Sequence, residues 1–168
     1  IFGDSGKDQL LTEDGNDVIY AGSGDDYISS GAGNDFLDSG TGSDFMDGGA
    51  GDDIYSYYSG AGIDSIKDSQ GENMIVFGDG ITTDQITVKR SNWNDIKMIF
   101  NEGEDALIIK NYCIDDDARG FTLVFADGTI VKATDEKSPL KNIQGEDDSE
   151  YMENIYEDGE SLSGADGN

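Results

Sequence analysis

The chain has 168 residues, of which 37 are acidic and 10 are basic, and it contains no histidine. Its net charge of −27 repels phosphate backbones and so disfavours nucleic-acid binding, and no apolar run is long enough to predict a membrane span. Without histidine, neither a Ser-His-Asp triad nor an HExxH zinc site can form, so we expect no enzymatic activity in this chain.

Residues 3–67 repeat a nine-residue phrase seven times, with a slip of two residues before the last copy. The copies begin at residues 3, 12, 21, 30, 39, 48 and 59. Every copy has glycine at its fourth position and aspartate at its sixth. The sixth-position residues are Asp8, Asp17, Asp26, Asp35, Asp44, Asp53 and Asp64. The eighth position is large and apolar in every copy, namely Leu10, Ile19, Ile28, Leu37, Met46, Tyr55 and Ile66.

The residue types of this phrase predict a metal-binding solenoid. Glycine permits tight turns, and carboxylate and carbonyl oxygens together are the ligands that Ca²⁺ prefers. The last three residues of each copy form a minimal strand with one apolar side chain pointing inward. Stacked coils of two copies each would place sixth-position aspartates about 4.8 Å apart. Two carboxylates at that spacing repel by about 1–3 kcal/mol, so the coils require cations between them.

The array resembles the RTX (repeats-in-toxin) family of calcium-binding nonapeptide repeats, whose signature is GGxGxDxUx. The resemblance implies an all-β parallel β-roll over residues 1–68, with several Ca²⁺ ions held between turn n and turn n+2. It makes the sixth-position aspartates the main anionic ligands, with backbone carbonyls of positions one to four and fifth-position side chains adding oxygens. The glycines of these turns are Gly22, Gly24, Gly31, Gly33, Gly40, Gly42, Gly49 and Gly51, and the fifth-position side chains are Asn16, Asp25, Asn34 and Asp52.

The end copies depart from the signature. Asp4 and Glu13 stand where glycine is expected, and Lys7 and Ile63 occupy the fifth positions of the first and last copies. We therefore expect copies three to six to form better calcium sites than the ends. A flexible Gly/Asp-rich linker is the alternative interpretation, but linkers do not preserve apolar positions.

Residues 69–141 are predicted to be rich in β-strands, because β-branched and aromatic residues alternate there and glycine is sparse. The alternating segments are residues 74–78, 85–90, 95–100, 105–112 and 121–133, which predict five or six strands. Asp127-Gly128 predicts a hairpin. The segment resembles the β-rich region that often follows RTX arrays. Because a solenoid needs a terminal cap, we predict that this segment caps the roll.

Residues 142–168 contain nine acidic residues and no lysine or arginine. Their ending, SLSGADGN, is similar to the opening of a second repeat array, and a disordered acidic tail is the alternative. Because repeat-like sequence stands at both ends, we expect the chain to be a fragment of a longer protein.

The RTX resemblance implies a calcium-dependent folding and secretion module of a larger secreted bacterial protein. Such an array stays unfolded at low cytosolic calcium, passes through the type I secretion machinery and folds outside the cell. Two alternatives remain open: a calcium-stiffened segment of a surface adhesin or surface-layer protein, and an auxiliary domain of a secreted protease or lipase. The outward seventh-position rings of Tyr27, Phe36 and Phe45 either stack between coils or form a ligand-binding face.

Overall fold

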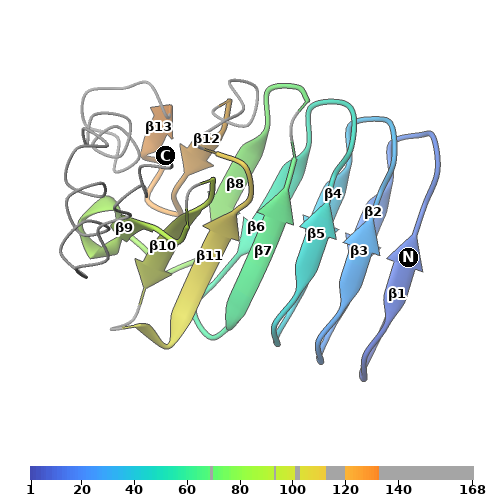
Figure 1. The fold of residues 1–168 in the computed structure, drawn as a ribbon, viewed down its shortest axis with the longest axis horizontal. Helices are drawn as coiled ribbons and strands as arrows, with labels where there is room; N and C mark the ends of the chain where they lie inside the picture. The colour runs from blue at the N-terminus through green and yellow to red at the C-terminus, as the bar shows by residue number, and fades with distance from the viewer. Residues whose placement is uncertain (69, 93, 101–102, 113–119, 133–168) are drawn as a thin grey trace, which may run out of the picture.

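The computed structural model of the chain describes residues 1–68, 70–92, 94–100, 103–112 and 120–132. This part of the chain is all-β, with a single 3₁₀ turn, η1 (Thr83–Gln85), and two sheets that face each other (Figure 1). The predicted tail, residues 142–168, lies outside the described residues. Within the described ranges, no helix has the length and apolarity needed to cross a membrane.

The first sheet has seven strands in the order β1-β3-β5-β7-β11-β10-β9. Their bounds are β1 Gln9–Leu11, β3 Tyr27–Ser29, β5 Phe45–Asp47, β7 Ile63–Lys67, β9 Thr87–Arg90, β10 Ile96–Phe100 and β11 Asp105–Ile109. The pairs from β1 to β11 are parallel, and β10 and β9 extend the sheet with antiparallel pairs.

The second sheet has six strands in the order β2-β4-β6-β8-β12-β13. Their bounds are β2 Val18–Tyr20, β4 Phe36–Asp38, β6 Ile54–Tyr57, β8 Met74–Phe77, β12 Thr122–Val124 and β13 Ile130–Lys132. All pairs are parallel except β12 with β13, which form the antiparallel hairpin predicted at Asp127-Gly128. The predicted all-β parallel roll is therefore confirmed.

The nonapeptide period becomes the register of both sheets, because successive copies alternate between them. Gln9 pairs with Tyr27 and Phe36 pairs with Ile54, so partners stand 18 residues apart. The spacing becomes 20 at the end of the array, where Ile54 pairs with Met74. This change is the predicted two-residue slip, and it shifts both sheets together because the extra residues lie within one coil.

The core of the roll is the line of eighth-position side chains. All seven are buried, from Leu10 at 4% exposure to six residues at 0%. Each strand buries its central residue and turns both neighbours outward, as in the exposed-buried-exposed pattern of β1 and β2. Burying one such side chain contributes about 1.5–3 kcal/mol to the free energy of folding, so the hydrophobic stabilisation from each coil is small.

The strands after the array join the sheets of the roll directly. β8 pairs with β6, β11 with β7 and β12 with β8, all in parallel. The rings of Tyr57, Phe77, Phe100 and Phe125 are buried together, with centroids 5.0–6.3 Å apart. β8 and β10, which end in Phe77 and Phe100, and β12, which precedes Phe125, lie toward the end of the molecule opposite β1 (Figure 1).

Candidate metal centre

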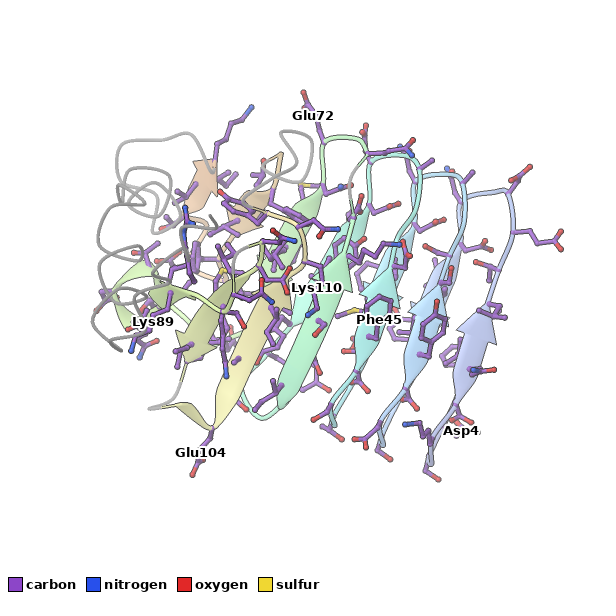
Figure 2. All side chains as sticks on the ribbon, viewed as in Figure 1. Asp4, Phe45, Glu72, Lys89, Glu104 and Lys110 are labelled. Atoms are coloured by element: carbon purple, nitrogen blue, oxygen red, sulfur yellow. The ribbon has the colours of Figure 1, made fainter. Side chains whose placement is uncertain are left out.

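Six of the seven sixth-position aspartates lie immediately before the short strands, in the turns that connect the two sheets, whereas Asp64 is the second residue of β7. One set, which we call the first ladder, consists of Asp8, Asp26, Asp44 and Asp64 and lies at the start of the strands of the first sheet. The second ladder consists of Asp17, Asp35 and Asp53 and precedes the strands of the second sheet. Oxygen-bearing side chains line both rows of turns (Figure 2). The structure thus sorts the predicted aspartates into two rows by alternate copies.

One carboxylate oxygen in each of five aspartates holds neighbouring coils together, namely in Asp26, Asp35, Asp44, Asp53 and Asp64. The backbone N–H of Asp8 donates to Oδ1 of Asp26 at 2.8 Å, and that of Asp26 donates to Oδ1 of Asp44 at 2.8 Å. The second ladder repeats this bond from Asp17 to Asp35 and from Asp35 to Asp53, both at 2.8 Å. A hydrogen bond to an ionised acceptor is roughly twice as strong as a neutral one. The ladders therefore fix both the spacing of the coils and the direction of each carboxylate.

The other carboxylate oxygen is left for a different partner. Across the described residues, Oδ2 is buried without a hydrogen bond in five of these aspartates: Asp8, Asp26, Asp35, Asp44 and Asp53. A buried carboxylate oxygen without a partner is costly, because the charged group has lost its water and gained nothing in return. A regular row of such oxygens fits a row of cations.

Backbone carbonyls crowd the same turns. A Cβ atom at Gly24 would collide with the carbonyl oxygen of Gly6, and one at Gly33 would collide with that of Gly15. The same holds for the other predicted glycines, Gly22, Gly31, Gly40, Gly42, Gly49 and Gly51, each against a carbonyl oxygen of the preceding coil. Glycine is required here because each turn places a carbonyl oxygen where a side chain would otherwise lie. All eight also have positive φ angles, which favour glycine.

Backbone oxygens must supply much of any coordination shell. Among the described residues, no three Asp, Glu, Cys or His side chains converge as a metal-binding group. Ca²⁺ takes six to eight oxygen ligands in flexible geometry, and carbonyls serve as well as carboxylates. The donor set, one carboxylate oxygen per turn beside stacked carbonyls, suits this hard cation and offers none of the sulfur or imidazole ligands that softer metals prefer.

A family comparison agrees with this chemistry. Residues 2–37 and 29–61 match the model of the RTX calcium-binding nonapeptide repeat, which spans four copies. Residues 2–61 are an RTX calcium-binding repeat array. A search of curated proteins found no significant match to the chain.

Burial raises the proton affinity of two ladder carboxylates of the RTX array, Asp53 and Asp64. It raises the pKa of Asp53 to about 7, and the nearby carboxylates of Asp68 and Asp35 contribute to the rise. Burial likewise raises the pKa of Asp64 to about 7, with Asp44 adding to it. A bound cation would neutralise the charge that burial disfavours, so it would compete with protons for these sites.

The fifth-position side chains make a contact of their own. Oδ1 of Asn16 accepts the backbone N–H of Asn34 at 2.9 Å, and Oδ1 of Asn34 accepts that of Asp52 at 3.1 Å. Oδ1 of Asp25 accepts the backbone N–H of Ser43 at 3.1 Å. These exposed bonds run between coils and reinforce the stacking. That these side chains also supply oxygens to calcium stays a prediction.

At the N-terminal end, the RTX array keeps the backbone shape of the signature despite its sequence. Asp4 stands at a glycine position and takes φ 72°, in the same left-handed region as its counterpart Gly22 at φ 109°. Oδ2 of Asp8, in the same copy, is one of the five unpartnered oxygens. The first copy thus keeps its oxygen donor, although it lies on an edge strand with only one neighbouring coil.

Our reading of the sequence missed the groups that close the two rows of turns. Asn73 takes the sixth position of an eighth copy, with Oδ1 accepting the backbone N–H of Asp53 at 2.8 Å. Asp105 accepts the backbone N–H groups of Gly60 and Gly62 at 2.8 and 3.3 Å. A sequence signal existed for both, because Gly71-Glu72-Asn73 and Gly103-Glu104-Asp105 repeat the glycine-to-acid spacing of the nonapeptide.

Proposed function

We propose that this chain is a calcium-dependent folding and secretion module of a larger secreted bacterial protein, without enzymatic activity of its own. The observation that carries the proposal is the set of five buried, unpartnered Oδ2 atoms, three in the first ladder and two in the second, which makes the calcium-free roll costly. Residues 1–68 add 15 acidic residues against two lysines, so the ion-free array repels itself.

Calcium binding can offset this cost and so make folding depend on the calcium concentration. A ligand that binds only the folded form stabilises it by RT ln(1 + [L]/Kd) per site. Extracellular calcium modules work with Kd values of roughly 0.1–1 mM, far above the calcium level of a cytosol. The array would then remain unfolded while it passes through type I secretion machinery and would fold outside the cell. The association of RTX repeats with secreted proteins supports this step.

Circular dichroism tests the proposal directly. Residues 1–68 should lose most of their β signal in chelator and regain it cooperatively in millimolar Ca²⁺. Mg²⁺ should be a poor substitute, because it demands rigid octahedral geometry and retains its water. A β spectrum that is complete in chelator and unchanged by calcium would refute the proposal.

A second candidate function, a calcium-stiffened adhesin segment, is favoured by a pocket on the outer face of the first sheet. This pocket of about 420 Å³ is lined by Phe45, Lys67, Asn92, Asn94, Asp95, Lys110 and Asn111. Phe45 stacks on Tyr27 with centroids 5.3 Å apart, so the predicted ring stacking between coils is present at this pair. Phe45 and Lys110 lie on the same face of the roll (Figure 2).

The pocket combines an aromatic ring with amide, carboxylate and ammonium groups, a set that suits a saccharide. Asp95 is held by Asn92, Lys110 and the backbone of Asn111, which makes the polar wall rigid. Titration of a glycan panel into the calcium-loaded protein, followed by isothermal titration calorimetry, tests this candidate. Binding that Phe45→Ala abolishes would support it, and no response to any glycan would remove it.

A further inference from the structure

The second ladder ends on an amide instead of a carboxylate. Asn73 is 1% exposed, and its Oδ1 accepts the backbone N–H of Asp53 at 2.8 Å. Asp35 and Asp53 each accept the same bond, at the same length, from the coil before. Asn73 therefore occupies the ladder position of an aspartate and accepts the same backbone hydrogen bond, but its side chain carries no charge.

The second polar atom of Asn73 has a partner inside the protein. Its Nδ2 donates to the carbonyl oxygen of Gln70 at 3.1 Å. In Asp35 and Asp53 the matching atom is Oδ2, which is buried and accepts no hydrogen bond. The side chain of Asn73 thus satisfies both of its polar atoms within the protein, whereas those of Asp35 and Asp53 each satisfy only one.

Other donors from the protein complete this end of the roll. The carboxylate of Asp68, which is buried, accepts the hydroxyl of Tyr55 at 2.5 Å and the backbone N–H of Gln70 at 3.1 Å. The backbone N–H of Glu72 donates to Oδ1 of Asp52 at 2.8 Å. Both carboxylate oxygens of Asp68 and Oδ1 of Asp52 are thus engaged by N–H and O–H groups.

We propose that Asn73 terminates the calcium row of the second ladder. Its amide nitrogen takes the place of an ion against the Gln70 carbonyl, so the turn that carries Gln70 and Asn73 closes without calcium. The ions of this ladder lie only between the coils N-terminal to Asn73. This inference rests on the calcium binding of the array, and it assigns where that binding stops.

The substitution Asn73→Asp tests the proposal. It keeps Oδ1 for the ladder bond but replaces the donating nitrogen by a buried, charged oxygen next to a carbonyl. The variant should bind one more Ca²⁺ per chain than the wild type, measured by equilibrium dialysis at saturating calcium. It should also need more calcium than the wild type to reach half of its β signal, because closing its last turn now requires an ion.

Asn94→Asp is the control. Asn94 is exposed and lies between β9 and β10, outside the repeat array, so its replacement adds the same charge away from the turns that would hold calcium. The number of ions bound by this control should equal that of the wild type.

The possible outcomes distinguish a failure of the proposed calcium-binding function from a failure of the inference about Asn73. If the wild type binds no calcium, the proposed function fails. If the wild type binds calcium and Asn73→Asp binds the same number of ions, only the inference about Asn73 fails. A variant that stays unfolded at saturating calcium also overturns it, because an added ion should rescue the added charge.

Discussion

Replacing Asp35 by asparagine separates the metal-binding role of a ladder aspartate from its structural role. In the wild type, Oδ1 of Asp35 accepts the backbone N–H of Asp17 at 2.8 Å, and asparagine keeps this acceptor. The substitution removes the charged Oδ2, which has no partner in the protein. At a calcium concentration of about 100 Kd, one site contributes about 2.7 kcal/mol to folding. The coil of Asp35 has a neighbour on each side, since β4 pairs with both β2 and β6, so it can serve two ions.

Loss of one to two sites predicts a destabilisation of about 3–5 kcal/mol for Asp35→Asn in saturating calcium. For a folded unit of this size, that corresponds to a fall in the thermal midpoint of at least about 10 °C. Asp8→Asn is the matched end variant, because β1 pairs only with β3 and its coil can serve one ion. It should cost about half as much. The assay is thermal unfolding followed by circular dichroism at 10 mM Ca²⁺.

Two results would contradict this reasoning. Equal losses for Asp35→Asn and Asp8→Asn would show that interior turns do not serve two ions. A variant that gains no β signal at any calcium concentration would show that the asparagine disturbs packing and not only calcium binding.

Three further predictions concern the turns, the pH dependence and the strands after the array. Gly42→Ala should prevent calcium-induced folding, because its Cβ would collide with a carbonyl oxygen of the preceding coil. Gly128 also has a positive φ but has open space around it, so Gly128→Ala should lower the free energy of unfolding by only about 1 kcal/mol. Similar losses of stability for the two variants in chemical unfolding would contradict this. Burial raises the pKa of Asp53 and Asp64 from 3.8 to about 7. Between pH 3.8 and about 7, the folded calcium-free form therefore binds more protons than the unfolded chain, and its stability falls as the pH rises through this range. Protons and calcium both stabilise the folded form at these carboxylates, so the midpoint of calcium-induced folding should lie at a lower calcium concentration at pH 6 than at pH 8. A midpoint independent of pH would refute this. Ending the chain at residue 68 removes β8 and β11, which pair with β6 and β7. The truncated chain should therefore need a higher calcium concentration for half of its folding and should expose apolar surface that binds dyes. Folding at the same calcium concentration as the full chain would instead indicate that the following segment is an independent domain.

The roll could be predicted from the sequence because one local rule repeats. An apolar residue two positions after each aspartate must face inward in a three-residue strand, and all seven such residues are buried. The aspartate ladders follow from the same period, because a constant spacing stacks like residues. Even the slip could be read, since an insertion of two residues keeps the alternation of inward and outward side chains intact.

The arrangement of the later strands could not be read in this way. Their alternation predicts strands but not which sheet each one joins, because no repeat fixes their neighbours. β11 takes the place next to β7, although β8, β9 and β10 come between them in the chain. The register of β11 is shifted relative to the array, with Leu107 opposite Asp64. That shift goes with the bonds from Asp105 to the loop before β7, a contact between residues more than 40 positions apart.

The alternation of copies between two sheets also explains why calcium-induced folding should be cooperative. Each coil contributes one turn to each ladder, and the eighth-position side chains of both sheets share one core. An ion that closes a turn of the first ladder positions the following strand, and that strand leads directly into the next turn of the second ladder. A coil closed at one turn only would leave its other strand unpaired and its apolar residue exposed. Sites on opposite edges of the roll are thus coupled through the chain itself, although no side chain needs to reach from one ladder to the other.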